Sequence, residues 1–366
     1  MYMLIRMQGQ VSTFDEQYAK AVQLLKQLIA TPSFSGSENL AAQHIEQYLQ
    51  NEGISFFRKG NNVWAKNRHF DSTKPTILLN SHLDTVRPNK SYTLDPFEAI
   101  VKEDKLYGLG SNDAGGALVS LMAVFTHYFN RQNLSHNVIF AASAEEENSG
   151  SNGIESVLLE LGEISFALVG EPTHMHLAIA EKGLLVLDCI AYGKSGHAAR
   201  EEGQNALYKA LPDIEWFLAY NFPRISEMLG TVKMSVTQIQ CGTQHNIVPD
   251  VCHFTVDVRC TDAYTLEEIL DVIRAHVSCE VTPRSMRIRP SSISEMHPVV
   301  QAGIGLGRKV YGSPTTSDQA LMPFPSLKIG PGDSARSHTA DEFIFLHEIK
   351  EGITLYIRLL DSIIYT

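Results

Sequence analysis

The chain has 366 residues, of which 44% are hydrophobic, and its 30 Lys and Arg against 41 Asp and Glu residues give a formal net charge of −11. A negatively charged surface repels phosphate groups, so we expect neither nucleic acid nor a membrane among the partners of this protein. A chain of this length can form two domains and bury ample core.

Cysteine usage and the lack of targeting signals favour a cytoplasmic protein. The five cysteines are odd in number and include no Cys-x-x-Cys pair, so we interpret them as core residues in a reducing compartment. Residues 1–7 contain too short an apolar run for a signal peptide and no small-residue cleavage site. No apolar run approaches the length that is needed to span a membrane.

The first elements that the sequence predicts are two helices and a hairpin. Helical spacing of apolar residues predicts a helix over residues 14–29. Ser35 and Glu38 have the spacing of a capping box, which predicts a second helix that begins there and continues through Leu49. Two short strands are expected next, on either side of a turn at Gly60.

A short apolar run from Ile77 to Leu79 predicts a strand that is buried on both faces. His82 and Asp84 follow at its carboxyl end, which is the edge of an open α/β sheet where binding sites form. A neutral imidazole beside a carboxylate suits a divalent metal, because the carboxylate can fix the imidazole tautomer or bridge a second ion. A single His-x-Asp pair is weak evidence for such a site.

The same order of apolar run and polar ligand occurs three more times. The runs and the residues that follow them are 138–142 with Glu145, Glu146 and Glu147, 166–169 with Glu171, and 327–329 with His338. If these strands lie side by side and parallel, their carboxyl ends gather two histidines and several carboxylates in one crevice. Like charges at that distance destabilise a fold unless cations neutralise them. The number of carboxylates favours two metal ions over one.

Asp113 lies in a glycine-rich segment, residues 107–116, directly before a helix whose apolar face includes Leu118 and Leu121. One interpretation makes Asp113 the N-cap of that helix, and for an isolated aspartate this is the favoured interpretation. The other makes Asp113 a metal-facing carboxylate, in a turn where glycines let the backbone approach the site closely.

After Glu171 the pattern changes to alternating strands and helices, which is typical of a small α+β domain of ferredoxin-like type. Its expected elements are strands at 181–192, 231–240, 251–260 and 284–288, and helices at 205–217 and 266–277. We therefore predict an α/β protein with a mostly parallel central sheet flanked by helices over residues 1–176 and 289–366. The α+β domain over residues 177–288 is inserted into it.

Seven motifs lie in a fixed order along nearly the whole chain. They are Ser81-His-Leu-Asp-Thr85, Gly110-Ser-Asn-Asp-Ala-Gly-Gly116, Glu145-Glu-Glu147, Gly170-Glu-Pro-Thr173, Gly193-Lys-Ser-Gly-His-Ala198, Asn246-Ile-Val-Pro249 and Ser337-His-Thr339. This ordered set resembles the M20 family of dinuclear zinc aminoacyl hydrolases, which have a zinc-exopeptidase-like fold. Within that family the chain looks most like acetylornithine deacetylases and succinyl-diaminopimelate desuccinylases.

The resemblance implies a metal centre with two zinc ions. In this pattern His82, Asp113 and Glu171 hold one ion, while Asp113, Glu147 and His338 hold the other, so that Asp113 bridges them. Cobalt or manganese can replace zinc, since mixed histidine and carboxylate ligands admit all three metals.

The resemblance also assigns two acidic residues next to the ligands. Asp84 orients His82, and Glu146 is the general base. Because three glutamates stand in a row at 145–147, a slip of this assignment by one position stays open.

In the inserted domain, which the resemblance makes a lid and dimerisation domain, three residues match functional positions. His197 supports the oxyanion and can complete the active site of the partner subunit in a homodimer. Asn246 and Arg259 hold the α-carboxylate of a small-molecule substrate, an N-acyl amino acid.

We expect metal-dependent removal of an acetyl group from an amino acid such as N2-acetylornithine. The alternative is a desuccinylase that acts on succinyl-diaminopimelate, or an enzyme for acetylcitrulline or succinylornithine. Ala114-Gly115 and Leu109 replace residues that many M20 members carry there, which leaves the substrate open. A catalytically silent, ligand-binding relative is a second alternative, against which the intact Glu146 and ligand set weigh. A serine hydrolase is disfavoured, because its Gly-x-Ser-x-Gly motif occurs only in broken form.

Overall fold

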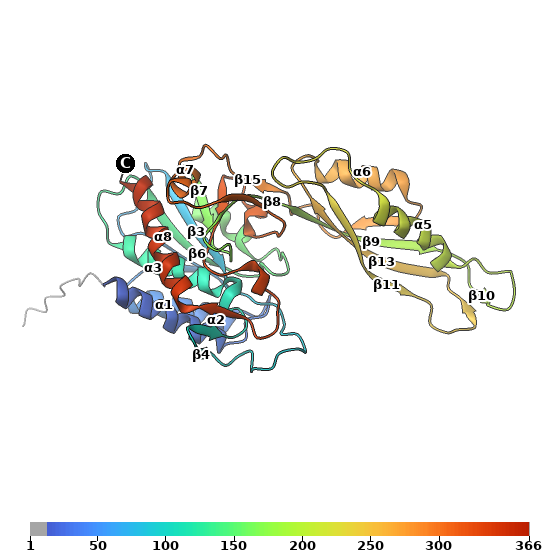
Figure 1. Ribbon diagram of the computed structural model, residues 1–366, viewed down its shortest axis with the longest axis horizontal. Coiled ribbons are helices and arrows are strands. Elements are labelled where there is room, and N and C mark those ends of the chain that lie inside the picture. The colour runs from blue at the N-terminus through green and yellow to red at the C-terminus, as the bar shows by residue number, and fades with distance from the viewer. Residues whose placement is uncertain (1–12, 366) are drawn as a thin grey trace, which may run out of the picture. The chain divides into compact units, whose positions relative to one another are not determined.

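The computed structural model describes residues 13–365 and divides the chain into two compact units (Figure 1). The first unit contains the chain up to Leu177, Glu295–Lys309 and the chain from Phe324 onward; the second contains Ala178–Ser294 and Val310–Pro323. Residues 289–294 and 310–323, which we assigned to the central-sheet domain, thus belong to the second unit. The expected absence of a signal peptide concerns residues 1–7, which lie outside the described residues.

The first unit is built on a mixed, mostly parallel sheet, as the sequence predicts. Every residue of the two central strands, β3 and β6, is buried, so the near-continuous apolar runs are explained by cover on both faces. Strand β3 pairs parallel with β6 and with β7, and β7 pairs parallel with β17, whereas β2 pairs antiparallel with β6 and with β1. The order across the sheet is β1 (Phe56–Lys59), β2 (Asn62–Lys66), β6 (Asn137–Ser143), β3 (Thr76–His82), β7 (Phe166–Val169) and β17 (Ser326–Lys328).

Helices pack beside this sheet, and a small antiparallel sheet lies next to them. Helix α3 contacts β3 and β6, and both α1 and α8 pack against α3 (Figure 1). The helices are α1 (Phe14–Ile29), α2 (Asn39–Asn51), α3 (Gly116–Phe129), α4 (Leu158–Leu161), α7 (Pro298–Gly305) and α8 (Leu346–Ile364). The small sheet has the order β18 (Phe343–Phe345), β5 (Lys105–Tyr107) and β4 (Ile100–Lys102).

The capping box that we expected at Ser35 and Glu38 is not formed. Helix α2 begins at Asn39, and Glu38 at its N-cap makes no side-chain hydrogen bond to the helix. The Ser35 hydroxyl instead donates to the carboxylate of Asp84 (2.6 Å), and the buried Glu38 carboxylate accepts a hydrogen bond from the backbone N–H of Glu145 (3.2 Å). Both side chains therefore form hydrogen bonds to the loops that follow His82 and that carry the three glutamates, instead of capping the helix.

The second unit has the expected order of strands and helices, with two differences. Its sheet has the order β11 (Lys233–Cys241), β13 (Val251–Cys260), β9 (Gly183–Tyr192) and β14 (Glu280–Pro283), and its helices are α5 (Ala206–Ala219) and α6 (Leu266–His276). The last strand was predicted at 284–288 but is formed by residues 280–283, because Val281 is the residue there that packs into the core of this unit. The predicted strand over 181–192 is divided at Lys182 into β8 (Leu177–Glu181) and β9.

The remaining strands of the second unit are short. Strand β8 pairs with β15 (Ser291–Ser292) and β16 (Val310–Ser313), and β10 (Gly196–His197) forms a two-stranded ribbon with β12 (Ile247–Val248). All five cysteines lie in this unit without a disulfide; Cys189, Cys252 and Cys260 are buried, as expected for core residues. No helix within residues 13–365 has both the length and the apolar character of a membrane span.

Candidate metal centre

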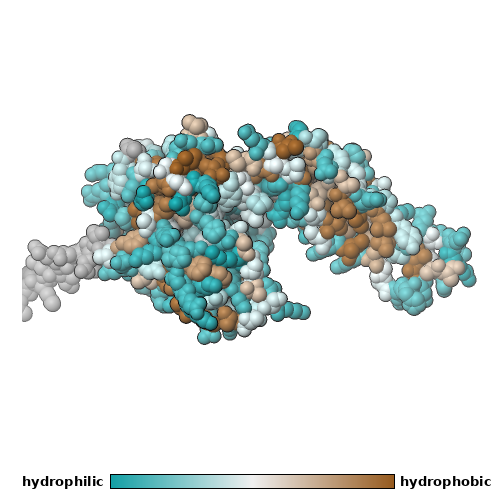
Figure 2. Space-filling model, in the orientation of Figure 1, coloured by the Kyte–Doolittle hydropathy of each residue, from teal (hydrophilic) through white to brown (hydrophobic). Residues whose placement is uncertain are grey.

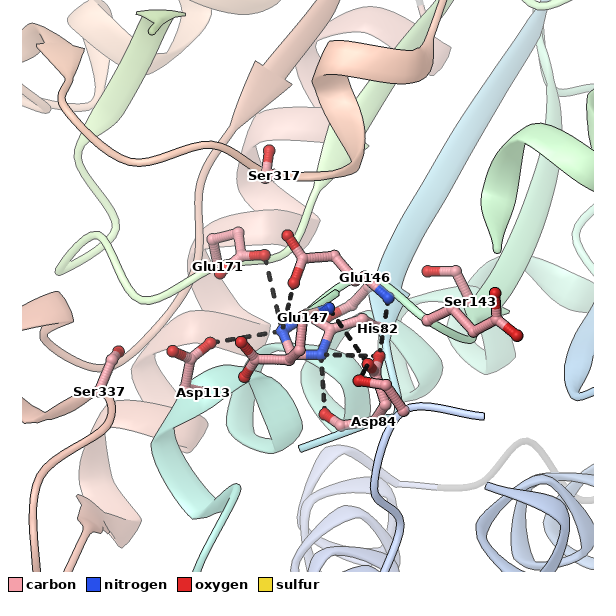
Figure 3. Close-up of polar contacts among 12 residues, drawn as sticks. His82, Asp84, Asp113, Ser143, Glu146, Glu147, Glu171, Ser317 and Ser337 are labelled. Atoms are coloured by element: carbon pink, nitrogen blue, oxygen red, sulfur yellow. Dashed lines mark hydrogen bonds and ion pairs between the residues drawn. The ribbon is translucent and has the colours of Figure 1, made fainter. Parts of the chain in front are cut away.

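The parallel strands of the first unit bring the predicted ligands together, as Figure 3 shows. His82 is the last residue of β3, and the loops after β6, β7 and β17 carry the three glutamates, Glu171 and His338. Because neighbouring parallel strands end at the same edge of a sheet, these loops converge there. The side chains of His82, Asp113, Glu147 and Glu171 point toward one another in this view.

Two groups of side chains have the geometry to hold a metal ion, and Asp113 belongs to both. In the first group, Nε2 of His82 lies 3.3 Å from Oδ1 of Asp113 and 3.7 Å from Oε1 of Glu171. In the second, Nε2 of His338 lies 3.0 Å from Oε2 of Glu147 and 3.6 Å from Oδ2 of Asp113. Within each group the ligand atoms all lie within 4.8 Å of one another. These are the two sets that the resemblance implies.

The imidazole of His82 is held in one tautomer. Its Nδ1 lies 3.0 Å from the backbone carbonyl oxygen of Asp84, which can only accept a hydrogen bond. Nδ1 therefore carries the proton when the imidazole is neutral, and in that form, which is the one that binds a metal, the lone pair of Nε2 faces Asp113 and Glu171. Asp84 thus orients His82 mainly through its main chain, since its carboxylate lies farther from Nδ1, at 3.5 Å.

The carboxylate of Asp84 fixes the turn that carries the glutamates. It accepts hydrogen bonds from the backbone N–H groups of Glu146 and Glu147, both at 3.1 Å, and from the hydroxyl of Ser35. Burial alone would raise the pKa of Asp84, but the hydrogen bond and the charge of His82, together with the bonds from Ser35 and from the N–H of Glu147, hold this pKa below its usual value. The position of the turn is therefore set by a charged group that is itself buried and fully engaged.

The three consecutive glutamates point in different directions. Glu147 lies with Asp113 and His338 in the second group. Oε2 of Glu146 lies 4.0 Å from Nε2 of His82, at the border of the first group. The carboxylate of Glu145 accepts hydrogen bonds from the backbone and side-chain amides of Asn152 and so belongs to its own loop.

Asp113 is not an N-cap. It lies in the turn Ser111–Gly115, and helix α3 begins only at Gly116 with Gly115 at its N-cap. The glycines of this segment do provide the conformational freedom that we expected: Gly110 has a φ of +73°. The carboxylate of Asp113 is thereby free to face His82 and His338, so the competing interpretation as a helix cap is wrong.

Glu342 is a residue of this site that our sequence analysis missed. Its buried carboxylate accepts the backbone N–H groups of Asn112 (2.8 Å), Asp113 (2.9 Å) and Gly110 (3.2 Å). Glu342 therefore fixes the backbone that carries the shared aspartate. The sequence feature that could have indicated Glu342 is its position four residues after the predicted ligand His338, directly before β18.

The electrostatics of the cluster call for cations. Burial raises the pKa of Glu171 to about 8, and it raises the pKa of Glu147 as well. Burial alone would lower the pKa of His82, but the carboxylates of Glu146 and Asp113 outweigh it and hold this pKa well above its usual value. The hydrogen bond to Glu147 raises the pKa of His338 to about 9. Two histidines and three crowded carboxylates are a donor set that fits two divalent ions.

The predicted lid residues all lie in the second unit, whereas the cluster lies in the first. His197 is exposed in β10, and the N–H of Ala199 donates to its Nδ1 (3.1 Å), so Nε2 carries the proton and can donate. Asn246 accepts a hydrogen bond from the N–H of Ala198 through its backbone carbonyl (3.0 Å), which places it beside His197.

Arg259 has a partner that the sequence did not reveal. Its Nε and Nη2 bind both oxygens of Asp257, at 2.8 and 3.0 Å, because residues two apart on β13 project from the same face of the sheet. Its Nη1 donates a long hydrogen bond to the hydroxyl of Thr316, at 3.4 Å.

Comparison with known proteins agrees with the geometry. Residues 78–362 match the model of peptidase family M20/M25/M40. The chain is 25% identical over 346 residues to a succinyl-diaminopimelate desuccinylase of Orientia tsutsugamushi, covering 88% of this chain and 85% of the relative. It is 26% identical over 377 residues to an acetylornithine deacetylase of Proteus mirabilis, covering 93% and 96%.

Among solved structures, the fold is similar to an M20 family metallo-carboxypeptidase of Sulfolobus solfataricus, with a TM-score of 0.75 and 17% identity. The alignment covers 95% of this chain and 99% of that one. At this identity the likeness concerns the fold alone.

Proposed function

Because the chain belongs to peptidase family M20/M25/M40, we propose that it is a metal-dependent amide hydrolase that removes an acyl group from the nitrogen of an amino acid. The observation that carries this proposal is the pair of ligand groups that share Asp113, with Glu146 at their border. We assign His82, Asp113 and Glu171 to one ion and Asp113, Glu147 and His338 to the other.

The bound ions supply Lewis acidity and lower the pKa of a water molecule toward neutrality. Glu146 takes the proton of the attacking water and returns it to the nitrogen of the leaving amine. Three features support Glu146 in this role. Its neighbour Glu145 is engaged with Asn152, Glu147 lies among the ligands, and Asp84 fixes the N–H of Glu146 itself.

We propose zinc as the metal in both positions, with cobalt or manganese as substitutes. A histidine and two carboxylates for each ion suit all three metals, and thiolates are absent from both groups within residues 13–365.

The second unit recognises the substrate in this proposal. His197 donates from Nε2 to the carbonyl oxygen as it becomes negative, and its protonation at Nε2 supports that role. Asn246 and Arg259 hold the α-carboxylate. Since Asp257 occupies Nε and Nη2 of Arg259, the carboxylate binds at Nη1 or takes the place of Asp257.

We propose N2-acetylornithine as the substrate, with desuccinylation of succinyl-diaminopimelate as the second candidate. The Proteus mirabilis relative, with 96% of its length aligned, supports the first, and the Orientia tsutsugamushi relative supports the second. Both candidates are small N-acyl amino acids, and we propose a cytoplasmic location for the protein.

We further propose that two chains form a homodimer through the second unit. Helix α5 exposes an apolar stripe of Tyr208 (70% exposed), Leu211 (50%) and Leu218 (86%), and β11 is an edge strand. Figure 2 shows apolar surface over the part of this unit that carries α5. An uncovered edge strand beside such a stripe is a surface that a second copy can cover.

The test is a panel of N-acyl amino acids, assayed with zinc and with cobalt while the metal content per chain is measured. Release of ornithine from N2-acetylornithine supports the first candidate, and release of succinate from succinyl-diaminopimelate supports the second. Two metal ions per chain with no turnover of any member of the panel would favour the catalytically silent relative.

A further inference from the structure

A cavity lies in the first unit, and none of the five proposed metal ligands lines it. Its volume is about 630 Å³, within the range of pockets that bind small molecules. One wall is the outward face of α8, from His347 to Arg358. The other wall combines Arg308 with the loop residues His174 and Met175 and with Pro331 and Gly332. We call this cavity the α8 pocket.

Most charged groups of the α8 pocket already have partners. Lys350 pairs with Asp15 at 3.1 Å, and His347 pairs with Asp104. The two oxygens of Glu348 bind the guanidinium of Arg336, at 2.7 and 2.9 Å, so its charge is neutralised.

Two guanidinium groups of the pocket are different. Arg308 and Arg358 form no ion pair with any carboxylate in the part of the chain that the structure describes, residues 13–365. The guanidinium of Arg308 makes a long hydrogen bond, from Nε to the carbonyl oxygen of Leu306 at 3.4 Å. One carboxylate of the pocket, that of Glu351, likewise forms no ion pair within these residues. The pocket thus has an excess of positive charge.

This excess is local, since the whole chain has a net charge of −11. The pKa of His176, a histidine next to the pocket wall, reflects this local positive charge. Burial lowers that pKa, and the charges of Arg308, Lys309 and His174 lower it further. The wall that contains Arg308 and His174, with Lys309 next to it in the chain, therefore has a positive potential on a negatively charged protein.

We propose that the α8 pocket binds a small dianion, such as a phosphate ester or a dicarboxylate, between the guanidinium groups of Arg308 and Arg358. A guanidinium presents paired N–H donors that fit phosphate and carboxylate oxygens two at a time. The apolar side chains of Met175, Leu355 and Pro331 on the same walls offer cover for an organic part of the ligand.

The place of the pocket in the fold separates such a ligand from the proposed metal ligands. His174 follows the proposed ligand Glu171 by three residues, and Pro331 and Gly332 precede the turn that leads to His338. A molecule bound here contacts the loop that follows Glu171 and the loop that leads to His338, but it contacts none of the proposed metal ligands.

The test measures binding calorimetrically on the metal-loaded full-length protein at constant ionic strength. The probes are inorganic phosphate, glycerol 3-phosphate and glutarate. We expect saturable binding of at least one probe at one site per chain. Arg308→Gln and Arg358→Gln should each weaken its Kd about tenfold, the loss of one charge-assisted contact.

Two further variants test whether the net positive charge of the pocket determines the affinity for the anion. Glu351→Gln removes the opposing charge and should tighten binding about threefold, a modest effect for an exposed group. Arg131→Gln removes an exposed arginine outside the pocket and should leave Kd unchanged. Unchanged metal content and Tm show that the variants fold.

The outcomes separate the possible ligands. Binding of the two phosphates alone assigns a phosphate ester, and binding of glutarate alone assigns a dicarboxylate. Failure of all three probes, or an unchanged Kd in the double variant Arg308→Gln/Arg358→Gln, overturns the proposal. So does binding of poly-aspartate without binding of any small probe, which assigns the pocket to an acidic protein segment. Because binding is read without turnover, the result is independent of the proposed hydrolase activity.

Discussion

The metal cluster of the first unit and the β10–β12 ribbon of the second hold their functional groups in opposite ways. In the cluster, the buried carboxylates of Asp84 and Glu342 accept five backbone N–H groups and so fix the loops of the glutamates and of Asp113. In the ribbon, His197 and Asn246 are exposed and are positioned by bonds to the neighbouring backbone. The groups that we propose for metal binding and proton transfer thus lie on loops that buried carboxylates fix, whereas those that we propose for substrate recognition lie on an exposed ribbon.

The largest expected effect tests the proton-transfer side of this comparison. Glu146→Gln should lower kcat by about a thousandfold or more, because the general base is lost, and should leave two metal ions per chain. Glu145→Gln is the matched control, since its carboxylate faces Asn152, and it should retain most activity. Steady-state kinetics with metal analysis measures both. If the control loses activity and Glu146→Gln does not, the base is Glu145.

The next effect tests whether Glu342 holds the cluster in place. Glu342→Gln weakens three hydrogen bonds to the backbone around Asp113 and should lower metal affinity about 10- to 100-fold, the usual effect of changing a residue that holds a metal ligand in position. Affinity is measured by competition with a chromogenic chelator. Asp341→Asn is the control, because the carboxylate of Asp341 binds Thr93 and Leu94 and is not bonded to the backbone around Asp113. Equal affinities in the two variants would contradict the role of Glu342.

A third change tests the ribbon. His197→Ala should lower kcat about 10²- to 10³-fold through loss of a donor to the oxyanion, with metal content unchanged. His253→Ala removes another exposed histidine of the second unit and should have little effect. Full activity in His197→Ala would remove the ribbon from catalysis and leave it a structural element.

A fourth prediction concerns the pH dependence of stability once metals are removed. In the folded state, burial raises the pKa of Glu171 and of Glu342 to about 8, so the folded chain binds more protons than the unfolded chain above the usual glutamate pKa. The raised pKa of His338, about 9, has the same sign, because its stabilising charge is lost as pH rises through that value. The chelated protein should therefore lose stability between pH 5 and pH 9.

Urea unfolding of the chelated protein at several pH values measures this loss. Adding metal should reverse the trend, since ions displace these protons and bind more tightly as pH rises. A chelated protein that is more stable at pH 8 than at pH 5 would show that the cluster does not dominate the pH dependence.

The smallest expected effect concerns the surface of the second unit. Leu218→Glu should shift the protein from dimer to monomer in sedimentation analysis, while changing the unfolding free energy of the chain by less than about 0.5 kcal/mol. Leu159→Glu alters an even more exposed leucine of the first unit (95%) and should leave the dimer intact. A dimer that survives Leu218→Glu places the interface elsewhere.

Sequence reasoning succeeded where the physics is local and repeated. A strand buried on both faces leaves an apolar run, so β7 was predicted with its observed bounds, and the ligands could be assigned to strand ends. The same rule indicated that loops far apart in sequence share one edge, and the structure does bring His82, Asp113 and His338 together.

It failed where a side chain acts across long sequence separations. Ser35 and Glu38 matched a local capping box, yet they bind Asp84 and Glu145, which lie 49 and 107 residues away. Glu342 was missed because its partners precede it by about 230 residues, at 110–113. The pairing of Arg259 with Asp257 is local, but nothing in the sequence distinguishes a paired from a free guanidinium.

The bond network of Glu342 has a consequence for the order of folding. The loop of Asp113 and the carboxylate that fixes it are about 230 residues apart in the chain. This loop therefore cannot take its final position until the segment around Glu342 has folded against it, so its position depends on a long-range contact that forms slowly.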